Sequence, residues 1–180
     1  MNVCVFCGSG LGANPVYAEA AKDLAILLSK NNCSLVYGGG NIGLMGILAD
    51  EMLKNSARVI GVIPDFLVQR EVAHHGLSEQ IVVKTMHERK KRMADLADFF
   101  VVLPGGMGTL DEMAEILTWK QLGLIDKPLG LLNVNGFFDP LVSQLEKMVK
   151  EGFLKKNNLL SIKIANNPPQ LITMLGVDAF

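Results

Sequence analysis

The chain has 180 residues, of which 49% are hydrophobic and 19% are charged, and its formal net charge at pH 7 is -1. This composition excludes a disordered chain. Because the net charge is near zero, the chain lacks the excess of basic residues that binds a nucleic-acid polymer, so the expected partner is a small molecule. Because no apolar run approaches the roughly 20 residues that span a bilayer, we expect no membrane segment.

Short apolar segments rich in β-branched residues recur along the chain. The first follows Met1 and Asn2 without a basic, cleavable leader, so we expect no signal peptide. Apolar runs without polar alternation are typical of strands that are covered on both faces. The predicted strands are residues 3–7, 34–37, 59–63, 81–83, 99–103 and 129–132, with a weaker one at 161–165.

Longer segments with helical periodicity separate these strands. The predicted helices are residues 15–29, 42–54, 86–97, 110–122, 140–150 and 168–175, and Asp139 is the predicted N-cap of the fifth. The stretch 65–79 is the one long connection without a periodic pattern. Alternating strands and helices require right-handed crossovers, so we predict an α/β fold: one Rossmann-like, doubly wound three-layer sandwich with a mainly parallel sheet, formed by residues 1–180.

The three cysteines include a pair, Cys4 and Cys7, with redox-motif spacing. A redox pair of this kind opens a helix, whereas these two lie in a predicted strand and point to opposite faces. We therefore expect buried thiols and a reducing compartment, the cytoplasm.

Two glycine loops follow the first two strands. Residues 8–13 formally match the dinucleotide fingerprint, but the second strand ends in Tyr37-Gly38-Gly39-Gly40, without the acidic residue that holds the ribose of NAD. This absence disfavours a dehydrogenase. In the second loop, residues 38–46, consecutive glycines before a helix favour ligand contact over tight packing alone.

A third loop, Pro104-Gly105-Gly106-Met107-Gly108-Thr109-Leu110-Asp111-Glu112, leaves the fifth strand. Its glycines free backbone amides to converge on a phosphate, and Thr109 is expected to cap the next helix and donate to the same anion. No lysine stands where a Walker loop requires one. Glu112 is expected on the first helical turn.

This loop matches the PGGxGTxxE signature of the LOG ("Lonely guy") family, the cytokinin riboside 5′-monophosphate phosphoribohydrolases. The segment Met86-His87-Glu88-Arg89-Lys90 resembles the MHxRK segment of that family, and Cys7-Gly8-Ser9 and residues 37–46 are also similar. The resemblance covers nearly the whole chain. It implies a homodimer that cleaves AMP or N6-substituted AMP to the free base and ribose 5-phosphate.

By position, the resemblance makes Arg89 and Glu112 the catalytic pair. We expect no cofactor and no metal, because His74, His75 and His87 are not spaced with carboxylates or thiols as a metal-binding set. Some family members carry the label lysine decarboxylase, but we can assign neither a Schiff-base lysine nor a partner for a pyridinium nitrogen. The expected substrate-binding residues are Ser9, Gly39, Gly40, Glu71, Lys90, Gly105, Gly106, Met107, Gly108, Thr109, Leu110, Asp111 and Thr118.

Cleavage of a ribosyl C1′–N bond builds positive charge on the sugar. A carboxylate at Glu112 suits the stabilisation of that charge and the activation of water, while Arg89 is expected to orient the substrate. The alternative is a carrier that binds a nucleotide or cofactor without hydrolysing it. Apolar residues of the helix after the third loop, Met113 to Leu122, are expected to form core, or otherwise a dimer contact.

Overall fold

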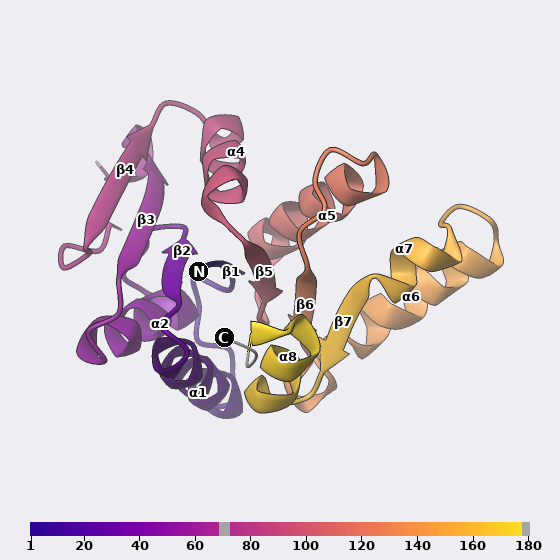
Figure 1. Cartoon of the computed structure of the whole chain (residues 1–180), viewed down its shortest axis with the longest axis horizontal. Coiled ribbons are helices and arrows are strands. Elements are labelled where there is room, and N and C mark those ends of the chain that lie inside the picture. Colours follow the sequence, from indigo (N-terminus) through magenta and orange to yellow (C-terminus); the bar gives the residue numbers. More distant parts are fainter. Residues whose placement is uncertain (69–72, 178–180) are drawn as a thin grey trace.

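The computed structural model describes residues 1–68 and 73–177, and their strands form one seven-stranded sheet (Figure 1). The strand order is β4-β3-β2-β1-β5-β6-β7, and every neighbouring pair is parallel. The sequence prediction of a mainly parallel sheet is therefore confirmed. The strands are β1 (Asn2–Phe6), β2 (Ser34–Tyr37), β3 (Val59–Pro64), β4 (Glu79–Val83), β5 (Phe99–Val102), β6 (Leu129–Leu132) and β7 (Ile162–Ala165).

Helices cover both faces of the sheet, which gives the three layers seen in Figure 1. One face carries α1 (Val16–Lys30), α2 (Gly43–Lys54) and α8 (Pro168–Leu175). The other face carries α4 (Met86–Leu96), α5 (Met107–Gln121), α6 (Asp139–Lys150) and α7 (Lys156–Leu160). The short elements α3 (Asp65–Val68) and η1 (Val134–Gly136) complete the described chain. None of the helices within the described ranges is long and apolar enough to cross a bilayer.

Two apolar cores result, one on each side of the sheet. In β1, Val3 and Val5 belong to the core under α1 and α2, while Cys4 and Phe6 belong to the core under α4 and α5. Cys7 lies in the first of these cores, so Cys4 and Cys7 do point to opposite faces, as predicted, and both are free and buried. The alternation of strand side chains thus builds both cores from each central strand.

The chain reverses the direction in which it adds strands between β1 and β5. Strands β2, β3 and β4 extend the sheet on one side of β1, and β5, β6 and β7 extend it on the other. In such open sheets, ligands bind at the carboxyl ends of the strands where the order reverses. The loops after β1 and β5, which are the first and third glycine loops, meet at this point.

The predicted starts of two helices were wrong. Helix α5 begins at Met107, with Gly106 as its N-cap, so Thr109 does not cap it and Glu112 lies on its second turn. Helix α6 begins at Asp139, with Phe138 at the cap position. The N-cap residues, Gly106 and Phe138, form no side-chain hydrogen bond to the helix. Neither helix start can therefore be recognised from a capping side chain in the sequence.

The prediction that all strands are covered on both faces was also wrong at the sheet edge. In β4 the residues alternate between half-buried and exposed, so one face of this edge strand, which carries Gln80 and Val82, is open to solvent. The stretch 65–79 is not wholly irregular, since it contains α3 and a bridge between Ala73 and Gly40.

Candidate functional site

The first and third glycine loops are held together by their backbones. The N–H of Gly8 donates to the carbonyl of Pro104 at 3.0 Å, and Gly8 and Gly105 are so close that a Cβ on Gly8 would lie 3.2 Å from the Cα of Gly105. The loops border a cavity of about 310 Å³. The cavity is lined by Gly8, Ser9, Gly10, Leu11, Gly12, Tyr17, Leu44, Pro104, Gly105, Gly106 and Phe137.

The second glycine loop contacts the first through the start of α2. The N–H of Leu44 donates to the carbonyl of Gly8 at 3.1 Å, and Gly43 packs directly against the backbone of Ser9. One amide at the N-terminus of α2 is therefore used by the protein itself.

Gly39 and Gly40 are buried among protein groups. Gly39 has φ +75° and would bring a Cβ to 3.1 Å from the Cβ of Ile63. The carbonyl of Gly40 accepts from the hydroxyl of Tyr37 at 3.1 Å, and the carbonyl of Gly39 accepts from the N–H of His74 at 2.9 Å. These contacts join the second loop to the segment that contains Ala73 and His74.

The N-terminus of α5 opens to solvent. Gly106, Met107 and Gly108 are exposed, and a Cβ at Gly106 or Gly108 would meet no atom within 4 Å. The first N–H groups of an α-helix have no carbonyl partner within the helix, so their positive partial charge faces this opening. Thr109 is buried, with its hydroxyl against Gly105, and Leu110 packs against the core beneath α5.

Local sequence determines where α4 begins. Thr85 is its N-cap and accepts from the N–H of Glu88 at 3.1 Å, while the carboxylate of Glu88 accepts from the N–H of Lys84 at 2.8 Å. This reciprocal pattern is a variant of the capping box. It places Arg89 and Lys90 just after the first turn of α4, facing α5.

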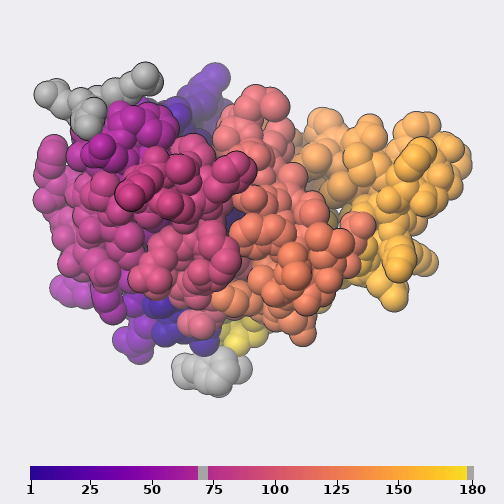
Figure 2. Space-filling view, turned by 90° about the horizontal axis from the view of Figure 1, so that it is seen from above, coloured from indigo at the N-terminus to yellow at the C-terminus, as the bar shows by residue number. Residues whose placement is uncertain are grey.

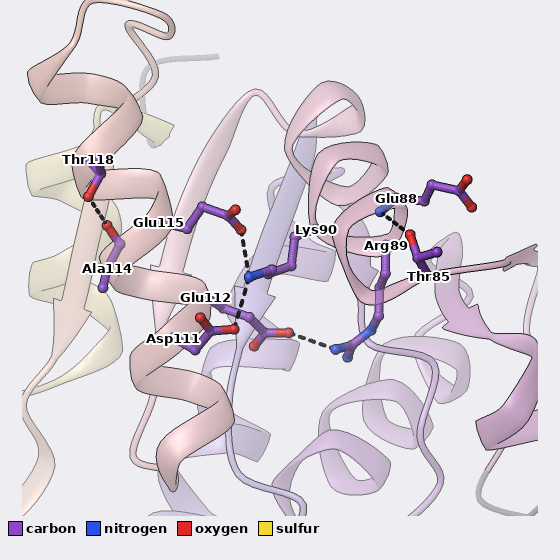
Figure 3. Close-up of polar contacts among 9 residues, drawn as sticks. All are labelled: Thr85, Glu88, Arg89, Lys90, Asp111, Glu112, Ala114, Glu115 and Thr118. Carbon is purple, nitrogen blue, oxygen red and sulfur yellow. Dashed lines mark hydrogen bonds and ion pairs between the residues drawn. The ribbon is translucent and has the colours of Figure 1, made fainter.

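Arg89 and Glu112 form a buried ion pair (Figure 3). The distance from Nη1 of Arg89 to Oε1 of Glu112 is 3.0 Å, and the two side chains are 10% and 9% exposed. Nε of Arg89 also donates to the carbonyl of Val62 near the end of β3 at 3.1 Å. The pair therefore lies at the carboxyl edge of the sheet, from which the three glycine loops leave.

Burial raises the pKa of Glu112, although the charge of Arg89 opposes this shift. Asp111 and Glu115 add to the rise, and Lys90 opposes it. Burial also raises the pKa of the Cys7 thiol, and the nearby negative charge of Glu112 adds to that rise. Glu112 thus lies near the end of β1, in a setting that makes its carboxylate more basic than usual.

A second ion-pair group lies beside the first. Nζ of Lys90 is 3.0 Å from Asp111 and 3.1 Å from Oε2 of Glu115, and it points between these acids in Figure 3. Glu115 was not predicted as a site residue. Its spacing of four residues from Asp111 on α5 was the available signal, because side chains four apart share a helix face.

The structure brings Arg89, Lys90, Asp111 and Glu112 together, but it does not bring Thr118 to them. Thr118 lies further along α5 and donates to the carbonyl of Ala114 at 2.8 Å (Figure 3). It lines an apolar groove. The predicted residue Glu71 lies outside the described residues. Within residues 1–68 and 73–177, no three His, Cys, Asp or Glu side chains are grouped so as to hold a metal ion.

The groove that Thr118 faces has a volume of about 460 Å³ and runs between α5, α6 and α7. In the predicted apolar segment of α5, Met113 and Ile116 are core residues, whereas Leu122 is 65% exposed. In Figure 2, α6 and α7 (gold) stand apart from the body of the molecule, next to α5 (orange).

Known proteins resemble this chain over most of its length. Residues 45–175 match the family model described as "Possible lysine decarboxylase". The chain is 46% identical over 173 residues to cytokinin riboside 5′-monophosphate phosphoribohydrolase LOG2 of Arabidopsis thaliana, covering 96% of this chain and 81% of that protein. It is also 46% identical over 173 residues to a probable enzyme of the same name from rice (Oryza sativa subsp. japonica), LOGL2, covering 96% of this chain and 71% of that one.

Solved structures share the fold at lower identity. The molybdenum cofactor binding protein of Rippkaea orientalis superposes with a TM-score of 0.74 at 24% identity, covering 99% of this chain and 97% of that chain. Its likeness shows the fold alone. Identity to the plant enzymes over almost the whole chain, together with the matching family model, shows that the chain belongs to the LOG family of cytokinin riboside 5′-monophosphate phosphoribohydrolases.

Proposed function

We propose that this protein hydrolyses the N-glycosidic bond of AMP or N6-substituted AMP and releases the free base and ribose 5-phosphate. The observation that carries the proposal is the buried Arg89–Glu112 pair, one turn beyond the open N-terminus of α5. The names of the relatives agree with this activity, since they are phosphoribohydrolases of cytokinin riboside 5′-monophosphates.

In this proposal the 5′-phosphate binds at the N-terminus of α5. The exposed backbone at Gly106, Met107 and Gly108 leaves room for phosphate oxygens, and the helix amides supply positive partial charge. The backbone around this phosphate site is proposed to be held in place by its neighbours Gly105, Thr109, Leu110 and Asp111. Binding energy from the phosphate would then align the ribose with the carboxylate of Glu112.

Glu112 is assigned to the reacting centre. As the bond from C1′ to the base nitrogen breaks, positive charge grows on the ribose, and a fixed carboxylate stabilises it. The same carboxylate takes a proton from the water whose oxygen forms the new bond to C1′. The departing base leaves with the bonding electron pair and gains a proton.

Arg89 is assigned to orientation of Glu112 and the substrate, because its charge is permanent and its guanidinium is anchored at Val62 and Glu112. Ser9 and the second-loop residues Gly39 and Gly40 are proposed to shape the ribose end of the site. Lys90 is proposed to contact the substrate from its position between Asp111 and Glu115. For Glu71 and Thr118, the resemblance to the LOG family is what supports a role in substrate binding.

We further propose that the protein acts as a homodimer. All residues of α6 are described and none is buried, although Leu141, Leu145 and Met148 are apolar and line the groove beside α5. A second copy would cover this face and would explain why Thr118 opens onto it. The three buried free thiols, Cys4, Cys7 and Cys33, support a cytoplasmic location.

Incubation with AMP and with N6-isopentenyl-AMP, followed by chromatography of the released base, tests the activity. We expect turnover by the wild type, and a loss of roughly 1,000-fold in kcat for Glu112→Gln, with AMP still bound. Glu19→Gln, which changes an exposed glutamate of α1, is the matched control and should keep full activity.

Full activity in Glu112→Gln would remove Glu112 from the mechanism. Tight AMP binding by the wild type without any base release would instead favour the carrier alternative.

A further inference from the structure

Gly38 directly follows β2 and is buried. Its backbone does not require glycine, because its φ is not in the left-handed region, unlike that of Gly39 at +75°. Alanine could therefore adopt the same backbone conformation without strain. The reason for glycine at this position must lie in what surrounds the Cα atom.

The space that a side chain would occupy at position 38 is filled by Arg89. A Cβ there would overlap Nη2 of Arg89 and would lie 3.2 Å from its Cζ and 3.3 Å from Sδ of Met45. The guanidinium passes directly over the Cα of Gly38 on its way from α4 to α5. Only a residue without a side chain leaves this passage open.

The side chain of Arg89 cannot move aside for a methyl group at position 38 and still keep its contacts. Its Nε donates to Val62 at 3.1 Å, its Nη1 lies 3.0 Å from Glu112, and its side chain is only 10% exposed. These contacts fix the guanidinium at both ends. A displacement by the width of a methyl group would break at least one of them.

We infer that Gly38 is a positioning residue for the reaction: its missing side chain provides the space through which Arg89 reaches Glu112. The inference rests on the proposed function in one respect, namely that Arg89 and Glu112 are the catalytic pair. The geometric part, that Gly38 sets the place of Arg89, stands on the contacts alone.

Displacement of Arg89 has a consequence for the charge of Glu112. The charged groups that act on this carboxylate are Arg89 and Lys90 of α4 and Asp111 and Glu115 of α5. Its own charge also reaches the thiols of Cys4, in the middle of β1, and Cys7, just after that strand. Arg89 is the first among the groups that lower the pKa of Glu112. When the guanidinium moves away, burial and the neighbouring acids raise that pKa further.

The test compares Gly38→Ala with Gly130→Ala. Gly130 lies in β6, and its methyl would meet the side chain of Leu171 at 2.7 Å, so it imposes a similar packing cost away from the site. We expect Gly38→Ala to lower kcat for AMP roughly 100-fold, as small misplacements of catalytic groups do, and Gly130→Ala to lower it less than about 3-fold.

A double variant separates positioning from general damage. Lysine lacks the Nη2 atom that the methyl would strike, so in the Arg89→Lys background we expect Gly38→Ala to cost less than about 3-fold further. An equal loss from Gly38→Ala in both backgrounds would overturn the inference. So would full activity of Gly38→Ala in the Arg89 protein.

Carboxyl ¹³C NMR titration gives a readout without turnover, with the Glu112 signal assigned from Glu112→Gln. We expect a higher pKa of Glu112 in Gly38→Ala than in the wild type and no change in Gly130→Ala; an unchanged pKa in Gly38→Ala would overturn the positioning role. If the wild type released no base, the proposed function would fail, while this titration would still decide whether Gly38 places Arg89.

Discussion

The guanidinium of Arg89 and the carboxylate of Glu112 are both about nine-tenths buried. Burial of one such charge without the other would be strongly destabilising, whereas the pair, with a further hydrogen bond to Val62, is tolerated. The cost of desolvation also leaves the carboxylate with a raised pKa. A group held in this way can take a proton from water more readily than an exposed glutamate does.

The charge of Glu112 predicts the pH dependence of the reaction. Glu112 must be ionised to accept a proton, so kcat/KM should fall as the pH falls through its pKa, which lies above the ordinary 4.5. Asp111→Asn removes a charge that raises this pKa, so the acid limb should move to lower pH. Lys90→Met removes a charge that lowers it, so the limb should move to higher pH.

Steady-state rates with AMP between pH 4 and pH 9, on the order of ten points for each variant, measure both shifts. Shifts in the same direction for Asp111→Asn and Lys90→Met would contradict the assignment of the acid limb to Glu112.

At the scale of the elements, the start of α4 positions Arg89 and Lys90. The cap of this helix, Thr85, accepts from Glu88, and the equivalent cap of α8, Asn167, accepts from Gln170 at 3.0 Å. Replacement of either cap by alanine should cost about 1 kcal/mol in the free energy of unfolding. Of the two variants, only Thr85→Ala should also lower kcat, because α4 carries site residues and α8 carries none of those named above.

Urea denaturation and AMP turnover measured on the same samples check this pair of variants. Equal activity of Thr85→Ala and Asn167→Ala would show that the cap of α4 does not position the site.

The first and second glycine loops are joined at Gly43. This residue has φ +64°, and a Cβ on it would overlap the backbone of Ser9, whereas Gly123 has φ +71° and open space around it. Gly123→Ala should therefore cost only the strain of left-handed backbone, about 1–2 kcal/mol. Gly43→Ala should cost roughly 3 kcal/mol or more, because the first loop must also move.

Denaturant midpoints of the two variants measure the difference, and Gly43→Ala should weaken AMP binding as well. Similar costs for both variants would mean that the first and second loops do not depend on this contact.

For the whole molecule, the sheet order places three glycine loops at one edge. Because β1 and β5 are neighbours at the point where strand order reverses, residues near positions 8 and 105 meet although almost 100 residues separate them. The same wrapping leaves the apolar side of α6 only half-buried at the far end of the sheet. The site and the proposed dimer surface therefore belong to different parts of α5.

The dimer proposal predicts the effect of a charge in the groove. Leu145→Glu places a carboxylate among the apolar residues between α5 and α6, so it should shift the protein from dimer to monomer. Met174→Glu changes a partly exposed residue of α8 on the other face and should leave the dimer intact. Light scattering after size-exclusion chromatography gives the mass; a monomeric wild type would contradict the proposal.

The fold class and the motifs could be predicted from local features of the amino-acid sequence. Apolar runs at residues 34–37, 99–102 and 129–132 have no polar alternation, because both faces of those strands are covered, and this property is local. The glycines after β5 and the pattern from Met86 to Lys90 were likewise readable, since phosphate loops and helix starts depend on neighbouring residues. The start of α5 was misplaced because Gly106 caps it without a side-chain bond.

Which side chains meet in the site could not be predicted in the same way, because it depends on packing in three dimensions. The rotation of α4 and α5 against the sheet decides these contacts. It brings Arg89 to Glu112 over Gly38, and it places Lys90 between Asp111 and Glu115. It also turns Thr118 away from the site. Such rotations are set by packing between segments far apart in the chain, and no local pattern records them.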